Sequence, residues 1–290
     1  MTDHQIQSVD NRTISFADYG QASGKAVLCC HGGPGSRLEP KMISEQAAAA
    51  GFRLIGIDRP GYGKSTPLPG RSICDWTEDA LAVADHLALD TFFVLGNSTG
   101  GSYALATASV APDRVLGVLV GCGMTDMAWA NDVEDAKMAG ALAIWHAPNR
   151  EAAIAVAIDQ FGEHGEKMLA MDEEAPPMLS PPDMAAILDP AYAAGDPNNE
   201  RFAQGVLGYA DDRIADGPSN GWSSFEVNKV VCPVIVVHGE QDWIVPIAHA
   251  RHTTAILQDA ELRTFAEHGH LSIGAEAVAA LVALQAKVDR

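Results

Sequence analysis

Short apolar runs recur along the chain, and each of them ends in a glycine-rich or charged turn. These runs are rich in β-branched residues and show no polar face. Strands that are apolar on both faces belong inside a parallel sheet that helices cover on each side. We therefore predict buried parallel strands at residues 26–30, 53–57, 91–95, 115–120 and 233–237.

Stretches with helical spacing separate these runs. They cover about 38–50, 74–88, 101–110, 246–258 and 274–288. Strands that alternate with helices imply right-handed crossovers and an α/β fold with a doubly wound, mostly parallel sheet. Residues 13–19 instead alternate apolar and polar side chains, which predicts an antiparallel edge strand. A further strand is expected at residues 261–265.

The alternation of predicted strands and helices is interrupted between residues 124 and 229. No long buried strand is predicted there, and alanine-rich helical patches are separated by proline-rich breaks. We interpret this segment as a helical cap, or lid, inserted between two strands of a core made of residues 1–123 and 230–290. Seven of the nine methionines fall between Met124 and Met184. They are either adaptable core filler or a pliable apolar wall over a pocket.

Charge restricts the partners of this chain of 290 residues, which has 38 acidic and 19 basic side chains and a net charge of −19. The predicted cap alone holds 19 acidic and 6 basic residues. Nucleic acid and anionic membrane surfaces would be repelled, so neither is expected as a partner. The apolar runs, about ten residues long, are too short to span a bilayer. The expected partner is a small-molecule substrate, and a homodimer is an open option.

The cysteines indicate the compartment. Their number is odd, and three of them lie in apolar runs, which favours buried thiols in a reducing environment. The first residues show neither the basic nor the apolar region of a secretion signal. We therefore expect a cytoplasmic protein. The cysteines are Cys29, Cys30, Cys74, Cys122 and Cys232.

The strongest chemical signal is the sequence GNSTGG at residues 96–101, which directly follows the strand predicted at 91–95. A G-x-S-x-G motif between a strand and a helix holds its serine on a sharp, strained turn. Such a turn presents the hydroxyl of Ser98 at a helix N-terminus, where the dipole favours negative charge. The motif therefore predicts Ser98 as a nucleophile.

A serine hydroxyl needs a general base and an acid that orients the base. Asp242 and His270 follow Ser98 in an order known from one triad architecture, and both come just after predicted strands. We predict His270 as the base and Asp242 as its orienting acid. His268 stays open as an alternative base, as do Glu240 and Asp126 as alternative acids.

The sequence HGGPGS at residues 31–36 forms neither helix nor strand, so its backbone N–H groups lack local partners. Acyl transfer needs two such donors aimed at the oxyanion, and each is typically worth about 10²–10³ in rate. We predict that the N–H groups of Gly33 and Thr99 supply them. His31 is expected to brace this loop through hydrogen bonds.

The sequence DRPGYGKS at residues 58–65 is a tight turn that we interpret as scaffold. An ion pair between Asp58 and Arg59 within this turn is one option. The ten histidines are scattered, and their spacing matches no metal-ligand set. We expect neither a metal nor another cofactor.

Together these motifs resemble the α/β-hydrolase superfamily, and the resemblance covers nearly the whole chain. It implies Ser98, Asp242 and His270 as the catalytic triad, with Gly33 and Thr99 as oxyanion donors. It also implies that residues 124–229 correspond to the family's variable cap.

The motifs do not point to a single subfamily. HGGPG is similar to the loop of proline iminopeptidases, but those enzymes carry a tryptophan where this chain has Thr99. GNSxGG is similar to the elbow of meta-cleavage-product hydrolases, whose aromatic residue after the histidine is Leu271 here.

The sequence favours a cofactor-free carboxylesterase for small or medium esters that acts through an acyl-enzyme on Ser98. Alternatives are an aminopeptidase of the proline iminopeptidase type, a C–C bond or lactone hydrolase, and a ligand receptor that keeps the fold. We expect an apolar acyl pocket lined by Met124, Trp129, Trp145 and Trp243.

Overall fold

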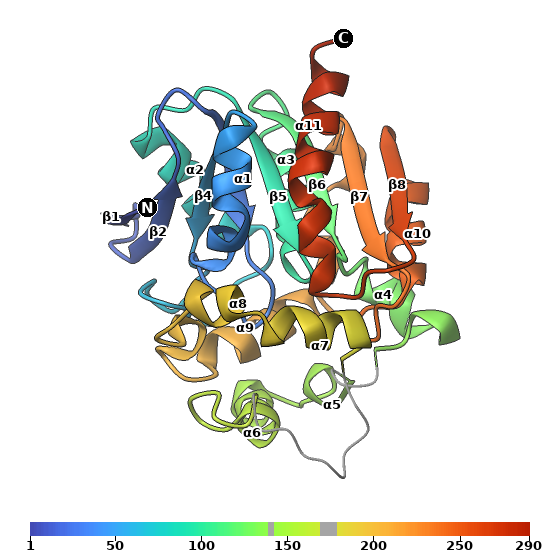
Figure 1. Ribbon diagram of the computed structural model, residues 1–290. Helices are drawn as coiled ribbons and strands as arrows, with labels where there is room; N and C mark the ends of the chain where they lie inside the picture. The colour runs from blue at the N-terminus through green and yellow to red at the C-terminus, as the bar shows by residue number, and fades with distance from the viewer. Residues whose placement is uncertain (139–141, 169–178) are drawn as a thin grey trace.

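The computed structural model describes residues 1–138, 142–168 and 179–290. Its centre is an eight-stranded sheet in the order β1-β2-β4-β3-β5-β6-β7-β8 (Figure 1). The strands from β4 to β8 in this order pair in parallel, which confirms the mostly parallel, doubly wound sheet. The strands are β1 (Thr2–Gln7), β2 (Thr13–Tyr19), β3 (Lys25–Cys30), β4 (Phe52–Ile57), β5 (Phe92–Asn97), β6 (Val115–Gly121), β7 (Val234–Gly239) and β8 (Ala260–Phe265).

The predicted edge strand is antiparallel, as expected, but it does not lie at the edge. Strand β2 pairs antiparallel with β4 on one side and with β1 on the other. The edge prediction was wrong because β1 is built mainly from polar residues that stay exposed or half-buried. A search for apolar runs passes over such a strand.

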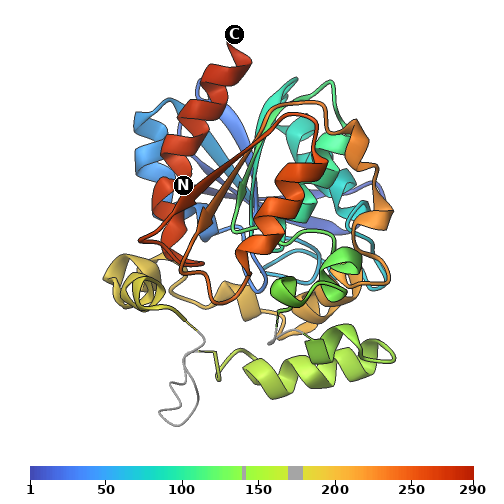
Figure 2. The same cartoon turned by 90° about the vertical axis from the view of Figure 1, so that its right-hand side faces the viewer.

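Helices cover both faces of the sheet, as the apolar strands required (Figures 1 and 2). Helices α1 and α11 pack on one face, and α2, α3 and α10 pack on the other. Helix α3 is buried over almost its whole length, so it has no solvent-facing side. The bounds are α1 (Ser44–Ala49), α2 (Asp75–His86), α3 (Gly100–Val110), α10 (Ile247–Ile256) and α11 (Ala277–Val288).

Short helices fill the segment between β6 and β7, and those from α5 to α9 lie below the carboxyl ends of the strands in Figure 1. No strand falls in this segment among the residues that the structure describes. This arrangement supports the division into a core and a cap of residues 124–229, which stays a proposal. Met171, Met178 and the proline-rich break at 175–177 lie outside the described residues. The helices are α4 (Met127–Asn131), α5 (Leu142–Trp145), α6 (Arg150–Phe161), α7 (Pro181–Leu188), α8 (Pro190–Gly195) and α9 (Leu207–Asp216).

Helices α5, α6 and α9 share an apolar cluster of their own. Phe161 and Tyr209 meet edge to face there, with ring centroids 4.8 Å apart. Tyr62 joins the same cluster from the DRPGYGKS turn. The turn predicted to be scaffold therefore also anchors the helices that lie over the sheet edge.

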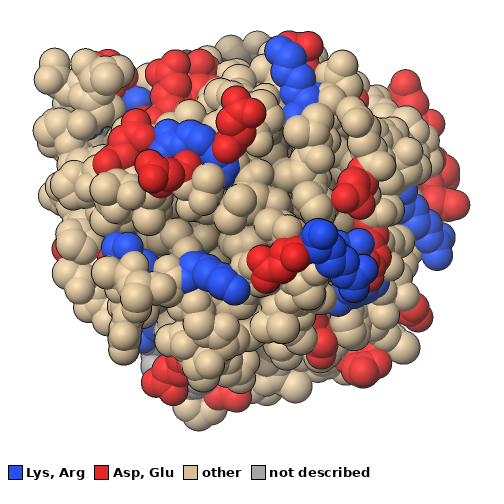
Figure 3. Space-filling model, turned by 90° about the horizontal axis from the view of Figure 1, so that it is seen from above, with Lys and Arg blue, Asp and Glu red and all other residues tan. Residues whose placement is uncertain are grey.

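The opposite end of the molecule, seen in Figure 3, carries acidic and basic side chains side by side. The excess of acid in the sequence therefore does not appear there as one broad patch. None of the helices in the described part of the chain combines the length and the apolar character needed to cross a bilayer.

Candidate active site

Ser98 lies on the sharp turn between β5 and α3 and has a φ of +53°. A non-glycine residue in this left-handed region costs about 1–2 kcal/mol. Its N–H donates to the carbonyl of Gly121 at 2.8 Å, so the neighbouring strand holds the strained turn in place. A Cβ at Gly96 or at Gly100 would clash with backbone carbonyl groups, which explains the two glycines of the motif.

His270 and Asp242 form the pair that the sequence predicted. The distance from His270 Nδ1 to Asp242 Oδ2 is 2.8 Å. The other carboxylate oxygen of Asp242 accepts the N–H groups of Ile244 and Val245, both at 2.8 Å. These bonds fix the carboxylate, which then holds Nδ1 protonated and leaves Nε2 as the basic nitrogen.

The pair is buried, and its charges perturb each other. Burial lowers the pKa of His270, but Asp242 outweighs burial, and the pKa lies above its ordinary value. Burial raises the pKa of Asp242, but His270 outweighs that effect and brings the pKa below its ordinary value. Asp242 is therefore ionised and stabilises a positive charge on the imidazole.

The alternatives left open by the sequence have other partners. His268 Nε2 lies 3.3 Å from Glu276 Oε1, and Glu240 accepts a hydrogen bond from the Thr264 hydroxyl at 2.9 Å. Asp126 caps helix α4 by accepting the N–H of Ala128 at 3.0 Å. Among these residues, only Asp242 and His270 pair with each other.

A turn after β6 contacts both the backbone of Ser98 and the residue before His270. Met124 N donates to the Ser98 carbonyl at 3.2 Å, and Cys122 Sγ lies 3.8 Å from the carbonyl of Gly269. In the described part of the chain, Ser98 Oγ and His270 Nε2 make no hydrogen bond, and neither atom is buried. Both atoms are thus free to meet a substrate.

Two backbone N–H groups beside Ser98 are also free. Gly32 N donates to Glu39 Oε2 at 2.8 Å, and Ser98 N is bound to Gly121. Gly33 and Thr99 have no acceptor for their N–H groups among the described residues. These are the two donors that the sequence predicted for an oxyanion, and Thr99 stands at the N-terminus of α3, where the helix dipole adds to the effect.

Arg59 holds the loop that carries Gly33. Its guanidinium donates to the carbonyl of His31 and, at 2.8 Å, to that of Gly32. The backbone N–H of Arg59 donates to His31 Nε2 at 3.1 Å. Burial keeps the pKa of His31 well below its ordinary value. His31 is therefore neutral and braces the loop, as predicted.

The suggested pair of Asp58 with Arg59 does not form. Asp58 pairs with Arg37 at 3.0 Å, whereas Arg59 pairs with Asp212 of α9 at 2.7 Å. Asp212 is fully buried and also accepts hydrogen bonds from Arg71, Tyr62 and Tyr103, at 2.6, 2.7 and 2.9 Å. Sequence reasoning missed this cluster because 153 residues separate Arg59 from Asp212.

Arg213, the next residue of α9, places a second buried guanidinium beside residues 31–36, which we call the oxyanion loop after the predicted role of Gly33. Its Nη2 donates to Thr99 Oγ1 and would lie 3.3 Å from a Cβ at Gly33. The same nitrogen pairs with Asp216, while Nη1 lies 3.5 Å from the sulfur of Met124. A buried guanidinium thus lies next to both Thr99 and Gly33.

Two of the predicted pocket residues connect directly to this region. Met124 Sδ lies 3.5 Å from Thr99 Oγ1, and the Trp145 ring lies 5.9 Å from the Arg213 guanidinium. Trp129 instead stacks on His252, with ring centroids 3.7 Å apart, and Trp243 is 55% exposed. Their part in an acyl pocket stays a prediction.

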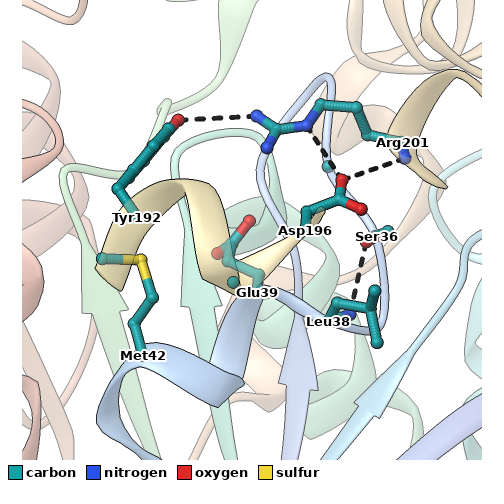
Figure 4. Close-up of a pocket in the computed structure, with 9 residues that line it drawn as sticks. Ser36, Leu38, Glu39, Met42, Tyr192, Asp196 and Arg201 are labelled. Carbon is teal, nitrogen blue, oxygen red and sulfur yellow. Dashed lines mark hydrogen bonds and ion pairs between the residues drawn. The ribbon is translucent and has the colours of Figure 1, made fainter. Parts of the chain in front are cut away.

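A small cavity of about 60 Å³ lies against Gly35 and Ser36 of the oxyanion loop, between residues 39–43 and helix α8 (Figure 4). Glu39 lines it together with Met42 and Tyr192. Glu39 Oε1 also accepts the side-chain N–H of Asn97 at 2.8 Å. Because Glu39 also binds Gly32, it links the loop to the residue before Ser98.

One group of described residues has the geometry for a metal ion. The ligand atoms of Cys122, Asp242 and His270 lie within 4.8 Å of one another. Burial raises the pKa of the Cys122 thiol well above its ordinary value, and the protonated thiol is a poor ligand. The hydrogen bond between Asp242 and His270 already uses the other two groups, so the arrangement favours proton transfer over metal binding.

The pKa of His270 gives a first prediction. If neutral His270 is the base, kcat/KM for an ester is expected to fall on the acid side with a midpoint above about 6.5, the ordinary histidine value. The raised pKa means that activity is lost at a higher pH than with an unperturbed imidazole. Initial rates with p-nitrophenyl butyrate across pH measure this midpoint; a midpoint below the ordinary value would contradict the assignment.

Among known protein families, a model described as the α/β hydrolase fold matches residues 25–276 of this chain. A probable proline iminopeptidase of Leptolyngbya boryana is 35% identical over 111 residues, or 37% of this chain and 34% of that protein. The dihydrolipoyllysine-residue acetyltransferase component of the acetoin cleaving system of Pseudomonas putida is 27% identical over 272 residues. That match covers 92% of this chain and 64% of the relative, so this chain spans less than two thirds of either relative.

A third relative matches over most of both chains. The 2-hydroxy-6-oxononadienedioate/2-hydroxy-6-oxononatrienedioate hydrolase of Paraburkholderia xenovorans is 27% identical over 269 residues, 89% of this chain and 84% of that protein. Among solved structures, a thermophilic esterase from Thermogutta terrifontis superposes with a TM-score of 0.68 at 19% identity and covers 99% of both chains. A hydrolase from Pseudomonas aeruginosa PA01 gives 0.68 at 18% identity, over 99% of this chain and 97% of that one. At these identities the two structures show a shared fold alone.

Proposed function

This chain belongs to the α/β-hydrolase fold family, and we propose that it is a serine hydrolase that cleaves carboxylic esters of small or medium molecules. In this proposal Ser98 attacks the acyl carbon while His270 Nε2 takes the hydroxyl proton. Asp242 holds the imidazole in the required tautomer and stabilises the imidazolium. The N–H groups of Gly33 and Thr99 stabilise the tetrahedral oxyanion.

The second half of the reaction returns the enzyme to its starting state. The imidazolium of His270 gives its proton to the departing alcohol as the tetrahedral intermediate collapses to an acyl-enzyme. Water then attacks the acyl carbon, and His270 takes a proton from that water. The second intermediate collapses to release the carboxylic acid, and the proton returns to Ser98 Oγ.

One observation carries the proposal: the 2.8 Å hydrogen bond of Asp242 with His270, in a chain whose Ser98 stands at positive φ on a sharp turn between strand and helix. Acyl transfer needs a histidine with a free Nε2 and a serine with a free hydroxyl, and among the described residues neither Nε2 of His270 nor Oγ of Ser98 makes a hydrogen bond. Strain at Ser98 is maintained by its hydrogen bond to Gly121, which fits a side chain held for reaction.

The charges near the oxyanion loop favour esters over substrates with a free ammonium group. An aminopeptidase would need an available carboxylate there to bind the ammonium. Glu39 binds the loop directly, and its two oxygens accept the N–H of Gly32 and the side-chain N–H of Asn97. Asp212 and Asp216 are paired with Arg59 and with Arg213. The guanidinium of Arg213 lies beside Gly33 and would repel an ammonium group.

A comparison of two chromogenic substrates tests this preference. We expect kcat/KM for p-nitrophenyl butyrate to exceed that for proline p-nitroanilide by at least about 100-fold, because a like-charge contact costs several kcal/mol. The released p-nitrophenol and p-nitroaniline are measured by absorbance. Hydrolysis of the anilide without hydrolysis of the ester would support the aminopeptidase alternative and contradict the esterase proposal.

A further inference from the structure

Asp183 is a fully buried carboxylate that reaches from helix α7 to the loop that carries His270. Its Oδ2 accepts the N–H of His270 at 2.8 Å. Its Oδ1 accepts the N–H groups of Leu271 and Ser272, at 2.8 and 3.0 Å, and the Ser272 hydroxyl at 3.1 Å. One side chain from residues 124–229 thus binds three successive N–H groups near the C-terminus.

The fit between α7 and this loop is close. Ser180, at the start of α7, donates its hydroxyl to Asp183 Oδ2 at 2.9 Å and keeps the carboxylate oriented. A Cβ at Gly269 would collide with Ser180 Oγ and with Asp183 Oδ2. Glycine just before His270 therefore allows the carboxylate to approach the backbone.

We propose that Asp183 is a positioning residue, which fixes the backbone of His270 so that the imidazole can serve Ser98. This inference rests on the proposed function, because that function makes His270 the base. A carboxylate that accepts N–H groups forms bonds roughly twice as strong as neutral ones. A displacement of about 1 Å at a reacting group can cost on the order of 10²-fold in rate, so a firmly held backbone matters.

The negative charge of Asp183 has a second effect, which can be separated from its hold on the backbone. Burial lowers the pKa of His270, Asp242 raises it most, and Asp183 and Glu39 raise it further. Removal of the Asp183 charge therefore lowers the pKa of His270. Among the described residues, titratable groups from five parts of the chain act on His270 or its partner. They are Asp242 and His238 from β7 and the loop after it, His249 from α10, Asp183 from α7, Glu39 from residues 39–43, and Cys122 from the turn after β6.

Asp183→Asn is a sharp test, because asparagine keeps the shape and one acceptor oxygen. That oxygen can still serve Leu271 and Ser272, whereas the amide NH₂ faces the N–H of His270, so that one hydrogen bond is lost. We expect kcat for p-nitrophenyl butyrate to fall about 10- to 100-fold while KM stays within about 3-fold. The acid limb of kcat/KM is expected to move to lower pH.

A measurement that does not depend on turnover accompanies the kinetics. The ring of His270 is titrated by NMR in the wild-type protein and in Asp183→Asn, and its pKa is expected to be lower in the variant. Asp159→Asn is the matched control, because Asp159 is an exposed carboxylate on helix α6. This control is expected to change neither kcat nor the titration.

The outcomes separate the two proposals. A wild-type protein without turnover contradicts the proposed function, while the NMR titration still tests the effect of Asp183 on His270. Wild-type kcat and an unmoved titration in folded Asp183→Asn overturn the present inference alone. If that variant does not fold, Asp183→Glu keeps the charge and shifts the oxygens: a lower kcat with a wild-type titration supports the inference, and a wild-type kcat overturns it.

Discussion

Ser98→Ala is expected to lower kcat for p-nitrophenyl butyrate by about 10⁵-fold or more, because in the proposed mechanism the acyl group is carried by Ser98 Oγ. At this φ every residue other than glycine is strained, so the change from serine to alanine neither relieves nor adds backbone strain. The fold should persist, since the Ser98 hydroxyl makes no hydrogen bond among the described residues. Initial rates at saturating ester, with circular dichroism to check folding, measure the effect.

The control for this variant is Ser23→Ala, which removes the hydroxyl of an exposed serine in the turn before β3. It is expected to leave kcat unchanged. A Ser98→Ala protein that retains more than a hundredth of wild-type kcat, about 3 kcal/mol in activation free energy, would exclude Ser98 as the nucleophile.

Asp212→Asn is expected to lower the free energy of unfolding by about 3–5 kcal/mol, the typical cost of removing one partner from a buried ion cluster. The substitution leaves Arg59 and Arg71 buried without their common carboxylate. It also frees the guanidinium that holds the carbonyl groups of His31 and Gly32, so kcat is expected to fall as well. Urea unfolding followed by tryptophan fluorescence measures the loss of stability.

The pH dependence of this loss has a definite sign. Burial raises the pKa of Asp212, but Arg59 and Arg71 outweigh burial, and the pKa lies well below the ordinary 3.8. The stabilisation is therefore fully present above pH 3.8 and is lost as the pH falls through the lower folded-state pKa. The difference between Asp212→Asn and the wild type should persist at neutral pH and shrink in acid.

Asp159→Asn again serves as the surface control and is expected to change the free energy of unfolding by less than about 0.5 kcal/mol. Equal stabilities of Asp212→Asn and this control would mean that the buried cluster does not hold helix α9 on the core.

The fold could be predicted where local pattern and global structure agree. The strands β3 to β7 are apolar enough to be recognised without their neighbours, and the helices α1, α2 and α3 follow from spacing. Strand β1 was missed because its side chains are polar, and only its pairing with β2 makes it a strand. Register and strand order depend on contacts between distant segments, which periodicity does not encode.

The candidate site also has one part that local sequence pattern predicts and one part that it does not. The turn of Ser98 carries its own signature, since the backbone geometry forces glycine at fixed positions. Asp242 and His270 each come just after a strand, which indicated that they share one edge of the sheet. The structure places Asp242 Oδ2 2.8 Å from His270 Nδ1.

The residues that support this site left no local signal. Asp183 lies 87 residues from His270, and Asp212 lies 153 residues from Arg59. Nothing in a single sequence distinguishes these two carboxylates from the many exposed ones in the acidic segment 124–229. Burial and distance identify them, and both quantities require the folded chain.

Covalent labelling by a fluorophosphonate tests the central claim most directly. Intact-mass measurement after incubation, followed by peptide mapping, should show one adduct per chain, on Ser98, and the labelling rate should fall as His270 is protonated. A wild-type protein that takes up no label, or that carries the label at another residue, would contradict the account and favour a receptor or a different nucleophile.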